Sequence, residues 1–338
     1  MKANSRFHSI RVCLSIAAMN TQKIAGSQIN ASRIIYGCMT SALPWGPERD
    51  AEKEKQGLAA FEQAVECGIN LFDHADIYCS GKGEILFGEF LKANPGLREK
   101  IYVQTKCGIR LPNSPVQGAP HRLDNSGKHI LSSVDASLKR LGLDYLDILL
   151  LHRPDALVEP EEVAAAFNKL YASGKVQAFG VSNHTAGQIA LLRRFVEQPL
   201  VANQVRINLM HSHMFDEPQN YDQGGGAGGF LGTLEYCRLH DITLQAYSPL
   251  MHGRLSQNDL NERESACLKA LQTMSAEKGV STDTLLMAWL LRHPAKIQPI
   301  VGSCNIGRIV ACCRADEVEL TREEWYSLWV AARGTKLP

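Results

Sequence analysis

Three ionisable side chains and a tyrosine follow one apolar segment of the sequence within six residues. In NLFDHADIYCSGKGE, residues 70–84, Asp73, His74, Asp76 and Tyr78 come directly after the apolar pair LF. A turn can be built from Ser, Asn and Gly alone. The concentration of titratable groups therefore indicates a functional site rather than a plain connection.

Two more ionisable residues end apolar segments of the same kind. Lys106 ends IYVQTK, and His152 ends YLDILLLH. Taken alone, Lys106 could equally be a surface lysine, and His152 could equally be a buried histidine with ordinary hydrogen bonds. Their recurrence in the same position as Asp73 favours one shared site, in which Tyr78 would take part.

An aspartate, a tyrosine, a lysine and a histidine in one place can deliver a proton. Free tyrosine is a weak acid with a pKa near 10, and a neighbouring Lys106 ammonium is expected to lower the pKa of Tyr78. Asp73 would hold the ammonium in place, and His152 would donate a hydrogen bond to a carbonyl oxygen. This set suits carbonyl reduction, in which the oxygen gains charge as hydride arrives and needs a proton.

Metal binding is a competing interpretation of the same residues. The loop after Asp73 and the residue His152 include side chains of metal-ligand type. A cation at Lys106 would compete with a divalent ion for Asp73, so we expect no metal. His74 and Asp76 are then expected to form hydrogen bonds within their loop. No Ser or Cys stands in a recognisable motif with a base, which argues against acyl transfer.

Short apolar segments alternate with amphipathic helical patterns from residue 33 onward. The predicted strands are residues 33–37, 69–73, 101–106, 145–152, 176–181, 201–207, 242–247 and 297–302. Between two of them, Ser126 and Gly142 stand where a helix N-cap and a C′ glycine belong. Near-continuous apolar strands that alternate with helices are typical of a parallel sheet buried on both faces.

Eight such units in series predict an α/β fold, the (β/α)8 TIM barrel. The rival is an open doubly wound sheet, but YGCMTSALPWGPE after the first strand lacks the G-x-G-x-x-G turn. Residues 211–229 predict a long loop, and residues 321–334 predict an extra C-terminal helix. The GGGAGG within that loop fits neither phosphate-binding pattern and is predicted to be a loop tip.

Barrel enzymes carry their active sites at the C-terminal ends of the strands. The polar residues at those ends are Asp73, Tyr78, Lys106, His152, Ser182, Asn183, Gln204, Arg206, Tyr247, Ser248, Ser303 and Arg308.

The composition narrows the choice of protein class. The chain has 338 residues, 45% of them hydrophobic, which suits one large barrel domain. A formal net charge of +1 gives no reason to expect nucleic acid or an acidic membrane as partner. Ten scattered cysteines without a C-x-x-C pair indicate a reducing compartment, the cytoplasm. No apolar run reaches the roughly 18 residues of a membrane span.

The N-terminal residues 1–21 are predicted to be a disordered extension before a single domain of residues 22–338. Residues 1–30 contain Lys, Arg and Ser but no Asp or Glu, a composition shared with organellar transit peptides. A disordered tail, or a start at Met19, explains this composition more simply than targeting does.

The strand-end residues resemble the pattern of the aldo-keto reductase superfamily. GINLFDHADIY resembles its motif of a glycine, a buried strand, Asp and then Tyr five residues later. TKCG, LLLHRPD, GKVQAFGVSNH and QAYSPL resemble its lysine, histidine, strand-5 and strand-7 motifs, in family order over residues 24–334. KIAGSQINASRIIYGCM looks like the hairpin that closes the bottom of the family's barrel. His74, where many members have Thr, resembles a bacterial-type oxidoreductase subgroup with the DHADIY variant.

The resemblance implies an NADP(H)-dependent oxidoreductase that reduces a small aldehyde or ketone. Its catalytic tetrad would be Asp73, Tyr78, Lys106 and His152, with Tyr78 as the acid/base. No residue of the family pattern identifies the substrate. The long loop at 211–229 and Trp45 are candidates to shape the substrate pocket.

The resemblance also implies ten cofactor-binding residues. They are Ser182, Asn183, Gln204, Tyr247, Ser248, Pro249, Leu250, Gly302, Ser303 and Arg308. In the family, the first three hold the nicotinamide carboxamide, the tyrosine stacks on its ring, the next three line the pyrophosphate and the last three meet the adenosine. A hydroxyl and a guanidinium there favour a ribose phosphate and therefore NADPH.

The chain departs from the family at this end. The lysine common before Ser303 is Gly302, and Ala311 and Cys312 replace the usual acid and amide. These changes bear on adenine contacts and on the choice between NADPH and NADH.

Two other functions stay open at this point. One is a cofactor-binding sensory or accessory protein with little turnover, because a relative of this fold serves as an accessory subunit of potassium channels. The other is a metal-dependent barrel lyase or hydrolase.

The expected partner is a small carbonyl or alcohol substrate, and the expected oligomeric state is a monomer or a weak homo-oligomer. Trp325 and Trp329 are explained by packing as well as by a place in the pocket.

Overall fold

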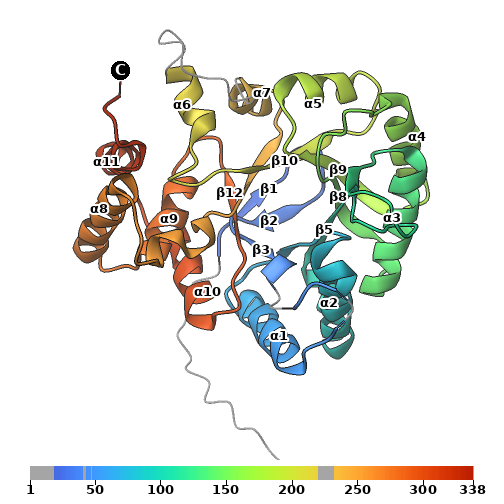
Figure 1. Cartoon of the computed structure of the whole chain (residues 1–338), viewed down its shortest axis with the longest axis horizontal. Coiled ribbons are helices and arrows are strands. Elements are labelled where there is room, and N and C mark those ends of the chain that lie inside the picture. Colours follow the sequence, from blue (N-terminus) through green and yellow to red (C-terminus); the bar gives the residue numbers. More distant parts are fainter. Residues whose placement is uncertain (1–18, 41–42, 47, 220–231, 338) are drawn as a thin grey trace, which may run out of the picture.

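Eight parallel strands form a closed barrel at the centre of the molecule. The computed structural model describes residues 19–40, 43–46, 48–219 and 232–337. The strands adjoin one another in chain order, and helices surround them (Figure 1). They are β3 (Ile35–Gly37), β4 (Leu71–Asp73), β5 (Tyr102–Cys107), β8 (Leu146–Leu151), β9 (Val176–Ser182), β10 (Leu200–Arg206), β11 (Thr243–Tyr247) and β12 (Gln298–Val301). The predicted (β/α)8 barrel is confirmed, with each predicted strand in its place.

Helices between the strands cover the outside of the barrel. They are α1 (Ala51–Glu66), α2 (Lys82–Ala93), α3 (Gly127–Leu141), α4 (Pro160–Ala172), α5 (Ala186–Arg193), α7 (Thr233–Leu239), α9 (Thr282–Leu291) and α10 (Ile306–Cys313). Helix α3 begins as its sequence predicts, because the Ser126 side chain accepts a hydrogen bond from the backbone N–H of His129. It ends at Gly142, whose φ of 66° lies in the left-handed region that glycine adopts without strain.

The bottom of the barrel is closed by an N-terminal hairpin. Strands β1 (Thr21–Lys23) and β2 (Asn30–Ser32) pair antiparallel and lie within the ring of barrel strands in Figure 1. Ile24 and Ile29 are buried in the same apolar cluster as Leu71, Ile148 and Val201. Apolar side chains of the hairpin thus help to fill this end of the barrel.

The start of the folded chain lies close to the predicted boundary. Strand β1 begins at Thr21, one residue before the predicted domain start, and Met19 is already buried. The rest of the predicted extension, residues 1–18, lies outside the described residues.

The predicted long loop at 211–229 begins as a helix, so that part of the prediction is wrong. Helix α6 spans His213–Gln219. Its Phe215 is buried, stacks on the ring of His293 at 4.7 Å and meets the edge of Trp289. Tertiary packing of one aromatic side chain thus fixes a turn of helix that local composition does not favour. The GGGAGG segment lies outside the described residues.

Two helices lie beyond the regular units. Helix α11 (Arg322–Arg333) is the predicted C-terminal helix, and α8 (Glu262–Lys278), which the sequence analysis did not separate, precedes α9 and packs on α11 (Figure 1). Trp325 stacks on Trp289 at 4.9 Å, and each indole N–H donates to the backbone oxygen of the other residue. This pair joins α11 to α9.

A small antiparallel sheet of β6 (Ile109–Arg110) and β7 (Arg122–Leu123) follows β5. It was also missed, because two-residue strands leave no period to detect. Among the described residues, no helix combines the length and the apolar character that crossing a bilayer requires.

Candidate active site

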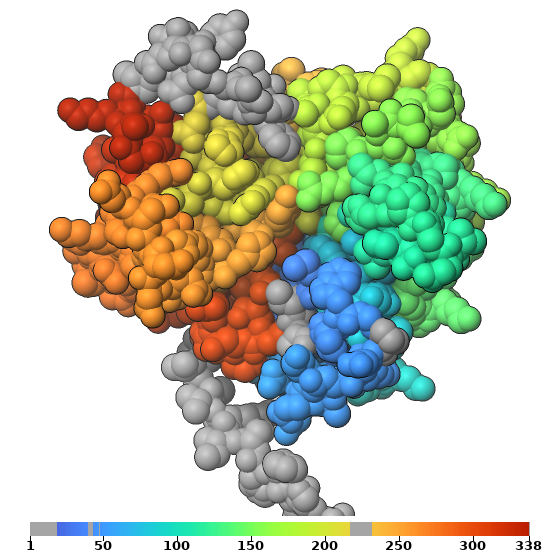
Figure 2. All heavy atoms as spheres, viewed as in Figure 1, coloured from blue at the N-terminus to red at the C-terminus, as the bar shows by residue number. Residues whose placement is uncertain are grey.

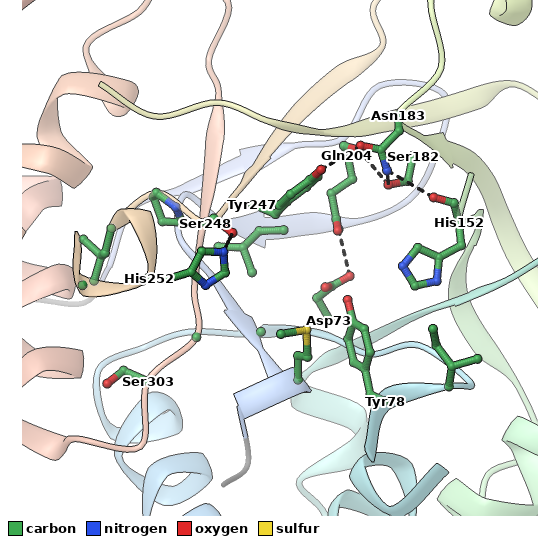
Figure 3. Close-up of a pocket in the computed structure, with 18 of the residues that line it drawn as sticks. Asp73, Tyr78, His152, Ser182, Asn183, Gln204, Tyr247, Ser248, His252 and Ser303 are labelled. Atoms are coloured by element: carbon green, nitrogen blue, oxygen red, sulfur yellow. Dashed lines mark hydrogen bonds between the residues drawn. The ribbon is translucent and has the colours of Figure 1, made fainter. Parts of the chain in front are cut away.

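A cavity of about 530 Å³ opens at the C-terminal ends of the barrel strands. In the space-filling view, blue, green and orange segments of the described chain meet around the middle of this face (Figure 2). The predicted site residues line the cavity, with the exceptions of the buried Lys106 and of Arg206, which is exposed at the end of β10 (Figure 3). The other lining residues are Gly37, Met39, Trp45, Ile77, Arg153, His252, Gly253 and Ile300. Residues far apart in sequence therefore share one site.

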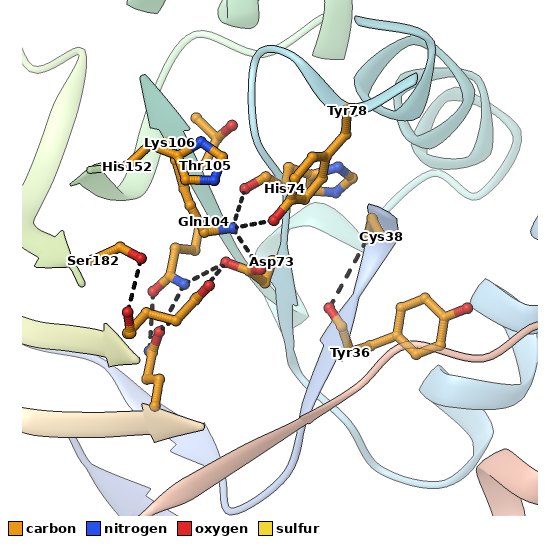
Figure 4. A network of polar contacts seen from close by, with 12 residues as sticks. Tyr36, Cys38, Asp73, His74, Tyr78, Gln104, Thr105, Lys106, His152 and Ser182 are labelled. Carbon is orange, nitrogen blue, oxygen red and sulfur yellow. Dashed lines mark hydrogen bonds and ion pairs between the residues drawn. The ribbon is translucent and has the colours of Figure 1, made fainter. Parts of the chain in front are cut away.

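The ammonium of Lys106 joins the tetrad from beneath the cavity (Figure 4). It donates to Asp73 Oδ2 at 2.7 Å, to the hydroxyl oxygen of Tyr78 at 2.9 Å and to the backbone oxygen of His74 at 2.7 Å. An ammonium has three N–H donors, so all three are used. With the side chain fully buried, the position of the charge is fixed.

Neighbouring strands place these groups together. Asp73 ends β4, and Lys106 stands near the end of β5, which pairs in parallel with β4. The loop that carries Tyr78 is fastened to β5, because His74 N–H donates to the Gln104 oxygen at 2.8 Å and Asp76 N–H donates to the Lys106 oxygen at 3.0 Å. The strand ends and these two backbone bonds set the height of Tyr78 above Lys106.

Buried glutamines hold the second oxygen of Asp73. Gln104 Nε2 donates to Asp73 Oδ1 at 2.6 Å, and Gln204 Nε2 donates to the same atom at 2.9 Å. Gln245 completes the layer by accepting from Gln104 at 2.9 Å and donating back to it at 3.0 Å. Hydrogen bonds to a charged carboxylate are stronger than bonds between neutral groups, so the glutamines help to fix Asp73 in place.

Burial and charge act against each other in the tetrad. Burial lowers the pKa of Lys106, but Asp73 and Tyr78 raise it by more, so the ammonium stays charged. Burial raises the pKa of Tyr78, and Lys106 lowers it by less. Lys106 thus lowers the pKa of Tyr78, as predicted, but the net direction is upward, because withdrawing a phenolate from water costs more than the cation offsets.

His152 stands beside Tyr78 as a neutral imidazole. The two ring centroids are 5.9 Å apart at an interplanar angle of 80°. Burial, and then the charges of Lys106 and Arg153, lower the pKa of His152 well below its ordinary value. Its Nδ1 atom is buried without a partner, while the residue lines the cavity. A neutral ring has one N–H donor, which fits a hydrogen bond to an uncharged oxygen in the cavity.

Polar groups of β9, β10 and β11 form the wall beyond His152 (Figure 3). Ser182 Oγ donates to the Gln204 backbone oxygen at 2.8 Å and accepts from Asn183 Nδ2 at 2.9 Å. The hydroxyl of Tyr247 donates to Asn183 Oδ1 at 2.9 Å, which leaves the ring face along the cavity. These four residues are rigidly connected, as a preformed binding wall requires.

The far end of the cavity holds a hydroxyl, an imidazole and a guanidinium. Ser248 Oγ and His252 Nε2 are 2.9 Å apart, and both residues have positive φ values, of 54° each. Arg308 lines the cavity near Ser303, and its Nε donates to Asp283 Oδ2 at 2.8 Å. No motif or strand-end pattern in the sequence indicates His252 or Asp283 as part of this site.

The sequence matches one known family along most of its length. A model of the aldo/keto reductase family matches residues 33–329. The chain belongs to this family.

This aldo/keto reductase is similar to two bacterial proteins over nearly the whole length of each relative. The 6-dehydroglucose reductase of Agrobacterium fabrum is 36% identical over 319 residues, which cover 94% of this chain and 99% of the relative. A Bacillus subtilis protein named uncharacterized oxidoreductase YcsN is 37% identical over 311 residues, with 91% and 96% covered. These relatives are consistent with an oxidoreductase.

A solved structure gives the same picture of the fold. The glycerol dehydrogenase AKR11B4 from Gluconobacter oxydans superimposes with a TM-score of 0.77. It is 23% identical in sequence, and the match covers 92% of this chain and 94% of that one. At this identity the likeness extends to the fold alone.

The prediction that His74 forms hydrogen bonds within its loop is wrong. Both ring nitrogens of His74 are buried without a hydrogen-bond partner, and the ring packs 4.7 Å from that of Phe87. Burial, and then Lys106, lower the pKa of His74 to about 3. Asp76 accepts a hydrogen bond from the backbone of Ile77 in the same loop, as predicted, and another from the Ser133 side chain, while its Oδ1 atom has no partner. The His74 ring faces helix α2 rather than its own loop.

Aromatic residues divide between the cavity and the core. Trp45 lines the cavity and is 56% exposed. Trp325 and Trp329 are buried elsewhere, and Trp329 Nε1 donates to Ser212 Oγ at 3.0 Å. Within the described ranges, no group of three or more His, Cys, Asp or Glu side chains is arranged to hold a metal ion.

The donor set of the cavity fits a nicotinamide cofactor. Hydrogen-bonding groups stand at one wall in Ser182, Asn183 and Gln204, beside the exposed face of the Tyr247 ring. The Nε2 atom of Gln204 is taken by Asp73, so its Oε1 atom is the part left to accept a hydrogen bond from an amide. A carboxamide needs such a mixture of donors and acceptors next to an aromatic face.

Proposed function

We propose that this aldo/keto reductase reduces a small aldehyde or ketone to the alcohol with NADPH. The observation that carries the proposal is the hydroxyl of Tyr78, which accepts from the buried Lys106 ammonium at 2.9 Å beside His152. A cavity that holds a proton donor, a neutral imidazole and a polar wall suits proton transfer to a carbonyl oxygen.

Tyr78 is the proton donor in this proposal. Its pKa above the ordinary value keeps the hydroxyl protonated at neutral pH. Lys106 stabilises the phenolate that remains after the proton leaves, and Asp73 keeps Lys106 in position. The residues therefore match the charge that develops during the reaction, which is the main source of rate enhancement in such sites.

His152 orients the carbonyl group. As a neutral ring it donates one hydrogen bond to the carbonyl oxygen without competing for the proton. Ser182, Asn183 and Gln204 hold the carboxamide of the cofactor, and the Tyr247 ring packs on its nicotinamide. The cofactor, when bound, supplies the hydride.

The other end of the cavity binds the rest of the cofactor. The pyrophosphate is lined by Ser248, Pro249 and Leu250. The ribose at the adenosine end contacts Gly302, Ser303 and Arg308. Arg308 supports NADPH over NADH, since a guanidinium binds phosphate in a fork of two N–H groups. Its Nε atom is held by Asp283, so the two terminal nitrogens are the ones offered to the ligand.

The names of two similar proteins support the proposal that the substrate is a small polar molecule with an aldehyde group. Two relatives, from Agrobacterium fabrum and Novosphingobium aromaticivorans, are each named 6-dehydroglucose reductase and are each 36% identical to this chain. We propose the same class of polar carbonyl compound here.

We further propose that the enzyme acts in the cytoplasm as a monomer or a weak homo-oligomer. The nine described cysteines form no disulfide with one another, which suits a reducing compartment.

The proposal is tested by a fluorescence titration with NADPH and NADH, followed by a panel of aldehydes and ketones. We expect tighter binding of NADPH and oxidation of NADPH by at least one polar aldehyde. Tight cofactor binding with no turnover across the panel would overturn the proposal and support an accessory or sensory protein instead.

A further inference from the structure

We propose that the substrate carries an anionic group and that Arg153 binds it. The inference rests on the proposed reduction of a carbonyl compound and names the chemical class of that compound. It concerns the wall of the cavity on the side of Tyr78 and His152, away from Arg308.

Arg153 is anchored by its backbone and free at its side chain. It follows His152 directly, and its own backbone oxygen accepts from Asn125 Nδ2 at 3.0 Å. The side chain is exposed and lines the cavity. The base of the side chain is therefore fixed beside the site while the guanidinium can turn toward a ligand.

The guanidinium of Arg153 has no acidic partner among the residues that the structure describes. Asp155 is close in sequence, but its two oxygens accept from the backbone N–H groups of Leu157 and Asn125, each at 2.9 Å. By contrast, Arg110 lies 2.9 Å from Asp124 in an ion pair. Arg153 thus presents a positive charge that nothing within the described chain neutralises.

The rest of the lining does not offset this charge. Asp73 is the one acidic residue along the described part of the wall, and Lys106 neutralises it at 2.7 Å. The charge of Arg153 is felt at the reaction centre, because it contributes, after burial and Lys106, to the lowered pKa of His152. A low-dielectric wall with one sign of charge attracts a ligand of the opposite sign.

The surroundings of Arg153 define the rest of the ligand. Trp45, Met39 and Ile77 line the cavity with apolar surface, and the indole of Trp45 is 56% exposed. A flat or short body would lie on this surface, with its carbonyl at Tyr78 and its anionic end at Arg153. A carboxylate or a phosphate matches the guanidinium with two parallel hydrogen bonds. The substrate class is therefore an aldehyde or ketone with an acid group.

The test compares matched charged and neutral substrates. 4-Carboxybenzaldehyde and methyl 4-formylbenzoate have the same body, and glyceraldehyde 3-phosphate and glyceraldehyde form the phosphate pair. We measure kcat/KM with NADPH for the wild type, for Arg153→Met and for the control Arg110→Met, which removes a paired arginine that does not line this cavity. Methionine keeps most of the side-chain length and removes the charge.

We expect the wild type to prefer at least one charged substrate over its neutral partner by about fivefold, the size of a partly exposed ion pair. Arg153→Met removes this preference, mainly through KM, since the contact is equal in the ground and transition states. High salt weakens the wild-type preference, and Arg110→Met retains it. The carboxylate and phosphate pairs tell which acid group fits.

Two outcomes separate this inference from the proposed function. If the aldehydes are reduced but Arg153→Met keeps the wild-type preference, the inference is overturned and the reductase stands. If none is reduced, the proposed function fails, and calorimetry of 4-carboxybenzaldehyde with the NADP⁺ complex still decides the role of Arg153. About fivefold weaker binding by Arg153→Met supports the inference, and equal binding overturns it.

Discussion

Lys106 donates a hydrogen bond of 2.9 Å to the hydroxyl oxygen of Tyr78 from a fully buried position. The oxygen of Tyr78 thus acts as the acceptor toward the interior. No described residue accepts the proton of that hydroxyl, and Tyr78 lines the cavity. The proton is therefore available to a ligand, on the side away from the ammonium.

Replacing Tyr78 by Phe removes this proton and keeps the ring. We expect Tyr78→Phe to lower kcat by about 10²- to 10⁴-fold, the usual contribution of a general acid. The Kd for NADPH should stay close to that of the wild type, because the cofactor wall is formed by other strands. Stopped-flow kinetics and fluorescence titration measure the two quantities. Wild-type turnover by Tyr78→Phe would show that another group supplies the proton.

The raised pKa of Tyr78 predicts different pH dependences for the two directions of the reaction. Reduction uses the protonated hydroxyl, which is the form present below the raised pKa, so kcat/KM should be flat across neutral pH. Alcohol oxidation uses the phenolate and should still be rising at about pH 10, the ordinary pKa of tyrosine. Profiles of kcat/KM in both directions check this. An oxidation rate that levels off near pH 7 would mean that Lys106 outweighs burial.

The ion pair of Lys106 and Asp73 predicts a matched pair of stability effects. Lys106→Met leaves the Asp73 carboxylate buried without its cation and should destabilise the protein by about 3–5 kcal/mol. The double variant Lys106→Met/Asp73→Asn removes both charges and should recover a large part of that loss. Urea unfolding of the three proteins measures the free energies. Equal stability of the single and double variants would show that the glutamine layer alone supports the carboxylate.

Much of this site follows from where residues stand in the sequence. In a parallel barrel, every strand ends at the same rim, so Asp73, Lys106 and His152 had to meet once their segments were strands. The motif order added Tyr78 and the polar wall that includes Ser182, Asn183 and Tyr247. These predictions needed no knowledge of side-chain contacts.

Other features depend on distance and depth, which sequence does not give. The net pKa direction of Tyr78 is a balance between burial and one cation, and residue order cannot weigh the two. Asp283 belongs to helix α9 rather than to a strand end, so only the fold brings it to Arg308. Gln104 and Gln245 did carry a signal, since each is the one amide side chain of a buried strand.

Asp76 predicts a pH-dependent stability in the loop that carries Tyr78. Burial, and then Glu84, raise the pKa of its carboxyl to about 7, against the lowering effects of Arg140 and Ser133. A carboxyl whose pKa is raised in the folded state stabilises that state below the unfolded pKa, near 4, and the stability is lost as the pH rises toward 7.

Asp76→Asn should therefore gain stability relative to the wild type between pH 4 and 7, by at most about 1.4 kcal/mol per pH unit, and no further above pH 7. Chemical unfolding at several pH values measures the difference. Asp144→Asn, at an exposed position, is the control and should show no such trend. A constant difference across this pH range would show that Asp76 ionises in the fold as it does in the unfolded chain.

The pairing of Asp283 with Arg308 predicts a change of cofactor preference. The carboxylate lies 2.8 Å from Arg308 Nε and offsets the charge proposed to meet the ribose phosphate. Asp283→Asn should tighten NADPH binding by about fivefold, the scale of a partly exposed ion pair, and leave NADH nearly unchanged. Asp259→Asn removes the same kind of partner from Arg254, outside the cavity lining, and is the control. Fluorescence titrations that instead show weaker NADPH binding would mean that Asp283 serves to hold the guanidinium in place.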